Sequence, residues 1–134
     1  MTLVDTSGWV AVADTSDQKH EAAVVVWQRL RRERERLLVS DLILAEVAIL
    51  LRRRAGHPIA VRAIDMILRS AVVELAYVDP TLLEEAFALF RRYRERELSL
   101  TDCASFALMR RRKLDSVFAF DEDFRVAGFR VLDG

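Results

Sequence analysis

Short apolar runs separated by longer amphipathic segments predict a protein in which strands alternate with helices. The amphipathic segments carry apolar residues at the three- and four-residue spacing of a helix face. Since parallel strands need crossover connections, and these are usually helical, the alternation predicts a mainly parallel sheet with helices on both faces. The runs that predict strands are residues 1–4, 37–39, 72–78 and 116–120, and residues 129–132 predict a last strand at an edge of the sheet.

The apolar positions within the helical segments predict which faces are buried. A run from Leu42 to Leu51 is almost continuously apolar and predicts a helix buried on most of its sides. A turn at 56–58 ends this helix and starts another, so that the two form a helical hairpin. The other predicted stripes are Ala23, Val26, Trp27 and Leu30; Ala60, Ile64, Ile67 and Leu68; and Leu83, Ala86, Phe87 and Phe90.

The composition indicates one soluble domain without a general affinity for polyanions. The 134 residues suit a single domain, 1–134. The 21 basic and 21 acidic side chains cancel, so a nucleic acid must be held by a local site and not by a global basic field. One cysteine excludes an internal disulfide, and neither a signal peptide nor a run of about 20 apolar residues is present. We therefore predict a cytoplasmic protein without a membrane span.

Four carboxylates lie at positions where a parallel sheet would gather them. Asp5 and Asp121 follow the first and fourth predicted strands, and Asp102 opens a helix that runs to about residue 112. Ligands of α/β sheets collect outside the carboxyl ends of the strands. For Asp5, a simple helix cap is the alternative. Glu46 interrupts an apolar helix, where an ionised side chain needs a partner, either a metal ion or an arginine.

The chemistry of this acidic set favours a bound cation, because like charges at short range raise one another's pKa unless a cation neutralises them. Oxygen ligands suit Mg²⁺ or Mn²⁺, whereas Cys103, His20 and His57 show no zinc-ligand spacing. A carboxylate-held metal ion can activate a bound water and orient a phosphodiester, so hydrolysis of a nucleic-acid backbone is the matching chemistry. Thr101 or Ser7 would then hydrogen-bond a water or the phosphate, or would merely cap a helix.

Four blocks of the sequence together resemble a PIN domain, most closely a VapC-type toxin of a toxin–antitoxin pair. They are Asp5-Thr6-Ser7, the apolar helix around Glu46, residues 99–106 and residues 117–124, and they span essentially the whole chain. The resemblance implies a three-layer α/β/α sandwich with strand order 3-2-1-4-5. It also implies an Mg²⁺- or Mn²⁺-dependent endoribonuclease with an RNA substrate, a cognate antitoxin and a homodimeric state.

The same resemblance assigns roles to the acidic residues. Asp5, Glu46, Asp102 and Asp121 match the catalytic set, and Asp5, Asp102 and Asp121 match its metal ligands. Asp123 is a candidate fifth member, for which an exposed turn residue is the alternative. The set of four is complete in this sequence, which favours catalysis.

Three other functions compete with this interpretation. A phosphoaspartate receiver or phosphatase would use Asp5 as a nucleophile, but it needs a second acid where Ser7 stands, and it needs a lysine at a strand end. A non-catalytic PIN-like binding module would not need the complete acidic set. A stand-alone RNA-processing PIN nuclease would share all four acids and stays open.

The predicted helices at 20–36 and 41–69 carry more apolar side chains than a small monomer needs. We predict that part of this surface binds an antitoxin segment or a second subunit. The alternative is that all these side chains cover the sheet.

Overall fold

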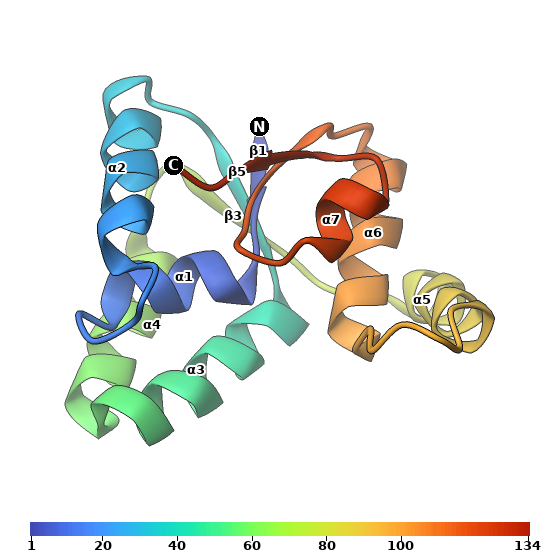
Figure 1. The fold of residues 1–134 in the computed structure, drawn as a ribbon, viewed down its shortest axis with the longest axis horizontal. Coiled ribbons are helices and arrows are strands. Elements are labelled where there is room, and N and C mark those ends of the chain that lie inside the picture. Colours follow the sequence, from blue (N-terminus) through green and yellow to red (C-terminus); the bar gives the residue numbers. More distant parts are fainter.

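A computed structural model describes all residues, 1–134, and shows a sheet of five parallel strands between two layers of helices (Figure 1). The order along the sheet is β3-β2-β1-β4-β5, which confirms the order implied by the resemblance. Four strands are somewhat shorter than the apolar runs that predicted them, and β2 extends one residue beyond its run. They are β1 (Thr2–Val4), β2 (Leu37–Ser40), β3 (Val73–Ala76), β4 (Ser116–Phe118) and β5 (Arg130–Leu132).

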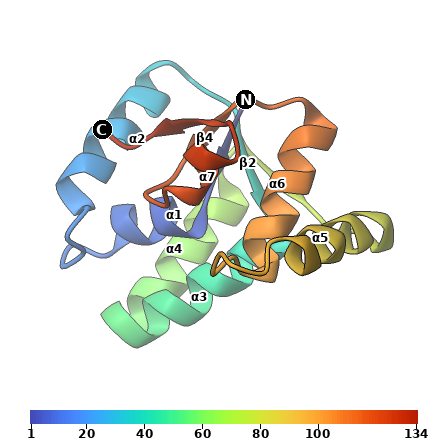
Figure 2. The same ribbon diagram turned by 45° about the vertical axis from the view of Figure 1, so that its right-hand side comes forward.

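Seven helices cover the sheet. On one face lie α1 (Thr6–Ala13), α2 (His20–Arg32), α3 (Asp41–Ala55) and α4 (His57–Arg69), and on the other α5 (Pro80–Arg92), α6 (Leu100–Arg112) and α7 (Asp123–Val126) (Figure 2). The chain leaves β1 toward β2 and later returns to pair β4 on the other side of β1. The direction of winding therefore reverses between β1 and β4, where α/β sheets bind their ligands. None of the helices is both long and apolar enough to cross a membrane.

The hairpin of α3 and α4 forms as predicted, but α3 is not buried on most sides. It packs against α1 and α4, so its opposite side faces solvent, and Ile49 is 53% exposed. On α4, Leu68 is 54% exposed, whereas Ala63 is buried. The side chains of α3 that do reach the core form one stripe: Ile43, Val47 and Leu51.

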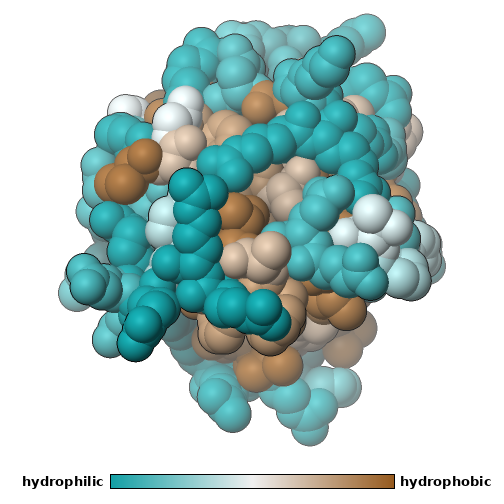
Figure 3. Space-filling model, turned by 90° about the vertical axis from the view of Figure 1, so that its right-hand side faces the viewer, coloured by the Kyte–Doolittle hydropathy of each residue, from teal (hydrophilic) through white to brown (hydrophobic).

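The predicted stripe on α5 is wrong at three of its four positions and correct at Ala86. Leu83, Phe87 and Phe90 are 43%, 48% and 44% exposed, while Leu82 and Ala86 are buried. The reason is that α5 packs against α6 rather than lying flat on the sheet, so only a narrow face is covered. The space-filling view from this side shows apolar atoms at the surface among charged side chains (Figure 3).

A close contact between α1 and β4 requires glycine at position 8. A Cβ atom there would lie 2.7 Å from the carbonyl oxygen of Phe118. This approach lets the backbone N–H of Asp5 donate to the Phe118 carbonyl (3.0 Å) and the N–H of Phe120 donate to the Ser7 hydroxyl (3.0 Å). The start of α1 is thereby attached to the end of β4, which brings two of the predicted acidic segments together.

Candidate active site

A cavity of about 320 Å³ opens at the carboxyl ends of β1 and β4. All four predicted acidic residues line it: Asp5, Glu46, Asp102 and Asp121. They come from the end of β1, the second turn of α3, the first turn of α6 and the segment after β4. A larger groove of about 540 Å³ lies between α2 and α4, but its only carboxylate is Glu35. The acidic set therefore has one shared location.

Asp5 is both the cap of α1 and a wall of the cavity. Its Oδ2 accepts hydrogen bonds from the Ser7 backbone N–H (3.1 Å) and the Ser7 hydroxyl (2.6 Å). Burial raises the pKa of Asp5 to about 7, the Ser7 hydrogen bonds oppose the rise, and the nearby Asp102 charge adds to it. The helix-cap alternative is thus correct locally, and it leaves the other oxygen, Oδ1, available.

Asp102 is held by a capping box at the start of α6. The Ser99 hydroxyl accepts from the Asp102 N–H (3.0 Å), and Asp102 Oδ2 accepts from the Ser99 N–H (3.0 Å). Burial raises the pKa of Asp102, and the charges of Asp121 and Glu46 raise it further. Ser99 also lines the cavity and was not predicted as a site residue, although its spacing of three from Asp102 is that of a capping box.

Glu46 is half-buried and accepts a hydrogen bond from the Thr6 hydroxyl at 2.7 Å. No arginine or lysine forms an ion pair with it, so the arginine alternative is wrong. Sequence reasoning missed Thr6 as its partner, because Thr6 and Glu46 lie on different helices. The contact joins the first turn of α1 to α3.

Asp121 and Asp123 have different surroundings. Asp121 lines the cavity, and its Oδ1 accepts from the Asp123 N–H at 2.9 Å. Burial raises the pKa of Asp121, and the neighbouring Asp123 carboxylate contributes to the rise. Asp123 does not line the cavity, and its carboxylate accepts two hydrogen bonds from Arg96 (2.6 and 3.1 Å). An arginine therefore already neutralises the candidate fifth acid.

The two predicted accessory residues, Ser7 and Thr101, differ from each other in their position relative to the cavity. Ser7 lines the cavity, but its hydroxyl is occupied by the bonds to Asp5 and to the Phe120 N–H. Thr101 is 9% exposed and does not line the cavity. Two cations that were not predicted as site residues, Lys19 and Arg54, line it instead.

The four carboxylates fit a cation in donor type and in charge. The hydrogen bonds described above engage one oxygen of each carboxylate and leave the other oxygen for a ligand. None of the four is in an ion pair, and neither Cys103 nor a histidine lines the cavity. As the side chains are placed, no three of them are close enough to hold one ion.

Comparison with known proteins agrees with the geometry. The sequence matches the PIN domain family over residues 2–130. Two relatives, both named 23S rRNA-specific endonuclease VapC20 and from two strains of Mycobacterium tuberculosis, are 39% identical over 129 residues, which is 96% of this chain and 95% of each relative. The crystal structure of Mycobacterium tuberculosis VapC20, described as a sarcin-ricin loop cleaving toxin, matches with a TM-score of 0.87 at 37% identity over 97% of both chains. The chain therefore belongs to the PIN-domain family, and within it resembles the VapC toxins.

Proposed function

We propose that this chain is a metal-dependent endoribonuclease that acts as the toxin of a toxin–antitoxin pair, and that its substrate is the sarcin-ricin loop of 23S rRNA. The observation that carries the proposal is the gathering of four carboxylates, without an ion-pair partner, around one cavity at the switch point of the sheet. The substrate assignment rests on the likeness to VapC20 over nearly the whole length of both chains.

In this proposal Asp5, Asp102 and Asp121 hold the metal ion, and Glu46 completes the catalytic set. A bound Mg²⁺ or Mn²⁺ would lower the pKa of a water molecule and offset negative charge on the phosphodiester. The hydrogen bonds of the cavity wall keep the acidic side chains oriented. Ser7 and Ser99 hold two of them from their own helix starts, while Thr6 holds Glu46 across two helices.

The test is cleavage of 23S rRNA in ribosomes by the purified chain, with cut positions mapped by primer extension. We expect a cut within the sarcin-ricin loop in Mg²⁺ or Mn²⁺ and none in EDTA, because none of the four acids forms an ion pair within the protein and the activated water of this chemistry needs a metal ion. Cleavage that survives chelation would contradict the metal dependence. Equal cleavage of unrelated RNAs would favour a stand-alone nuclease, and binding without cleavage would favour the non-catalytic module.

We also propose an antitoxin partner and a homodimer, acting in the cytoplasm where ribosomes are found. Exposed apolar side chains on three neighbouring helices support a protein partner: Val25 on α2, Ile49 on α3, and Val61, Met66 and Leu68 on α4. We expect light scattering to show a dimer, or a larger complex when the product of the adjacent gene is added. A monomer that binds no such product would reject both partners.

A further inference from the structure

The acidic cavity also contains two positive charges. Lys19 lies in the loop between α1 and α2, and Arg54 lies in the last turn of α3. Both line the cavity of the four carboxylates, and both also line an adjoining cavity of about 480 Å³. This second cavity contains none of the four catalytic acids. The two cations therefore stand where the two cavities meet.

Neither cation is held in a tight ion pair. Lys19 has no acidic partner, and the only partner of Arg54 is Asp17, at 3.7 Å. The Arg54 side chain is 52% exposed. By contrast, Arg111 bridges Asp79 and Glu85 on the far side of the molecule. The Lys19 ammonium is thus free of an acidic partner, and Arg54, which is held only at long range by Asp17 and also acts on the charge of Asp14, is exposed enough to contact a ligand as well.

Their neighbours in the second cavity are already satisfied within the protein. Asp14 accepts hydrogen bonds from the N–H and the hydroxyl of Ser16 (3.0 and 2.6 Å). Asp17 Oδ1 accepts from the backbone N–H of Lys19 (2.8 Å). These bonds shape the loop that carries Lys19 without using its ammonium group. The loop therefore presents this charge beside the catalytic cavity.

We propose that Lys19 and Arg54 form a phosphate-binding subsite, which holds the RNA strand at a phosphodiester next to the one that is cleaved. The inference rests on the proposed function and deepens it. An RNA strand that approaches four carboxylates is repelled, and a chain of zero net charge supplies no general attraction. A local pair of cations compensates this repulsion. The planar guanidinium can bind a phosphate through two hydrogen bonds, and the ammonium adds a point charge.

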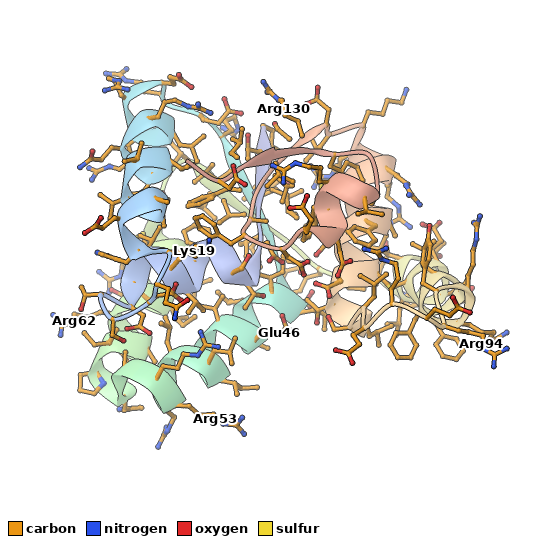
Figure 4. All side chains as sticks on the ribbon, in the orientation of Figure 1. Lys19, Glu46, Arg53, Arg62, Arg94 and Arg130 are labelled. Atoms are coloured by element: carbon orange, nitrogen blue, oxygen red, sulfur yellow. The ribbon has the colours of Figure 1, made fainter.

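Arg53 provides a matched control for Arg54. It is the preceding residue on α3, is exposed, and lines neither cavity. Figure 4 shows Arg53 extending from the side of α3 that faces away from Lys19. Arg62, on α4, serves as a second exposed control, for Lys19. Replacement of each cation by glutamine removes one charge and leaves a shorter, polar side chain at all four positions.

The experiment measures cleavage kinetics of sarcin-ricin loop RNA for Lys19→Gln, Arg54→Gln and the double variant. We expect KM to rise by roughly tenfold in the double variant with little change in kcat, since the interaction with the neighbouring phosphate is the same in the ground state and in the transition state. The slope of log(kcat/KM) against log salt should fall by roughly 0.7 for each cation that is replaced. Arg53→Gln and Arg62→Gln should change neither quantity. Arg54→Lys should recover part of the affinity, because it restores the charge but not the planar fork.

Two outcomes would overturn the subsite: an unchanged KM and salt slope in the double variant, or an equal effect from Arg53→Gln. Binding of the same fluorescein-labelled RNA, followed by anisotropy in an Asp102→Asn background, separates this inference from the proposed function. If the wild type does not cleave the RNA but the double variant binds it more weakly than Asp102→Asn alone, the function fails and the subsite stands. If the wild type cleaves it and the double variant behaves identically, the subsite fails and the function stands.

Discussion

Asp102→Asn is expected to lower the rate of RNA cleavage by roughly 10³-fold, since the metal-borne charge stabilisation is worth several kcal/mol and each factor of ten corresponds to about 1.4 kcal/mol. The substitution removes one of the charges that we propose hold the metal ion. The fold should be preserved, because the amide oxygen of asparagine can still accept the hydrogen bond from the Ser99 N–H that closes the capping box.

Asp115→Asn is the matched control for this substitution. Asp115 is exposed, lies just before β4, and does not line the acidic cavity. Asp115→Asn is the same chemical change made outside the site, so the kcat and KM of this variant should equal those of the wild type. The circular dichroism spectra of both variants should match the wild type, and Asp102→Asn should melt no lower than the wild type in EDTA, since it removes a buried charge. If Asp102→Asn keeps a tenth or more of the wild-type rate, Asp102 does not belong to the catalytic set.

The metal-free protein is expected to lose stability as the pH rises from about 5 to 8. The pKa of Asp5 is about 7 in the folded protein, and its ordinary value is 3.8, so between these values the folded state binds a proton that the unfolded state has released. Stability from this group is therefore present at low pH and is lost as the pH rises through the folded pKa. Asp102 and Asp121, whose pKa values burial also raises, act in the same direction.

For Asp5 alone, the loss between pH 5 and 8 is on the order of 3 kcal/mol, because one pKa unit corresponds to about 1.4 kcal/mol and about two units separate pH 5 from the folded pKa of this almost fully buried group. In a domain near this size, that is on the order of ten degrees in melting temperature. Asp5→Asn should remove most of this pH dependence in EDTA, since asparagine can cap α1 but does not titrate. Adding Mg²⁺ above pH 7 should stabilise the wild type by mass action, and the variant much less.

Between pH 5 and 8, the change in stability that comes from the raised pKa values is separate from the change caused by acids with lowered pKa values. Asp14, Glu74 and Asp79 have lowered pKa values, so they lose their stabilising contribution only as the pH falls below their ordinary values of 3.8 to 4.5. Differential scanning fluorimetry of the wild type and Asp5→Asn in EDTA gives the comparison, with Asp115→Asn as the control that keeps the wild-type slope. A wild type whose melting temperature is flat across this window would contradict the raised pKa of Asp5.

The alternation of strands and helices, and the four acids that line the cavity of the candidate site, were predictable from the sequence. Strand and helix periods are local properties, so the apolar runs identified all five strands and the longer helices between them, but not the short helix α7. The positions of Asp5 and Asp121 directly after strands were equally local. The order of the strands came from the resemblance to a family, because periodicity does not specify which strands pair.

The tertiary structure decided which face of each helix is covered and which residues meet across the cavity. Phe87 and Phe90 follow a regular helical stripe, yet they are exposed because α5 packs mainly against α6. The contact of Thr6 with Glu46 and the convergence of Lys19 with Arg54 join segments that are far apart in the chain. Such contacts depend on how helices are positioned on the sheet and against one another. Side-chain spacing within a single helix carries no information about that position.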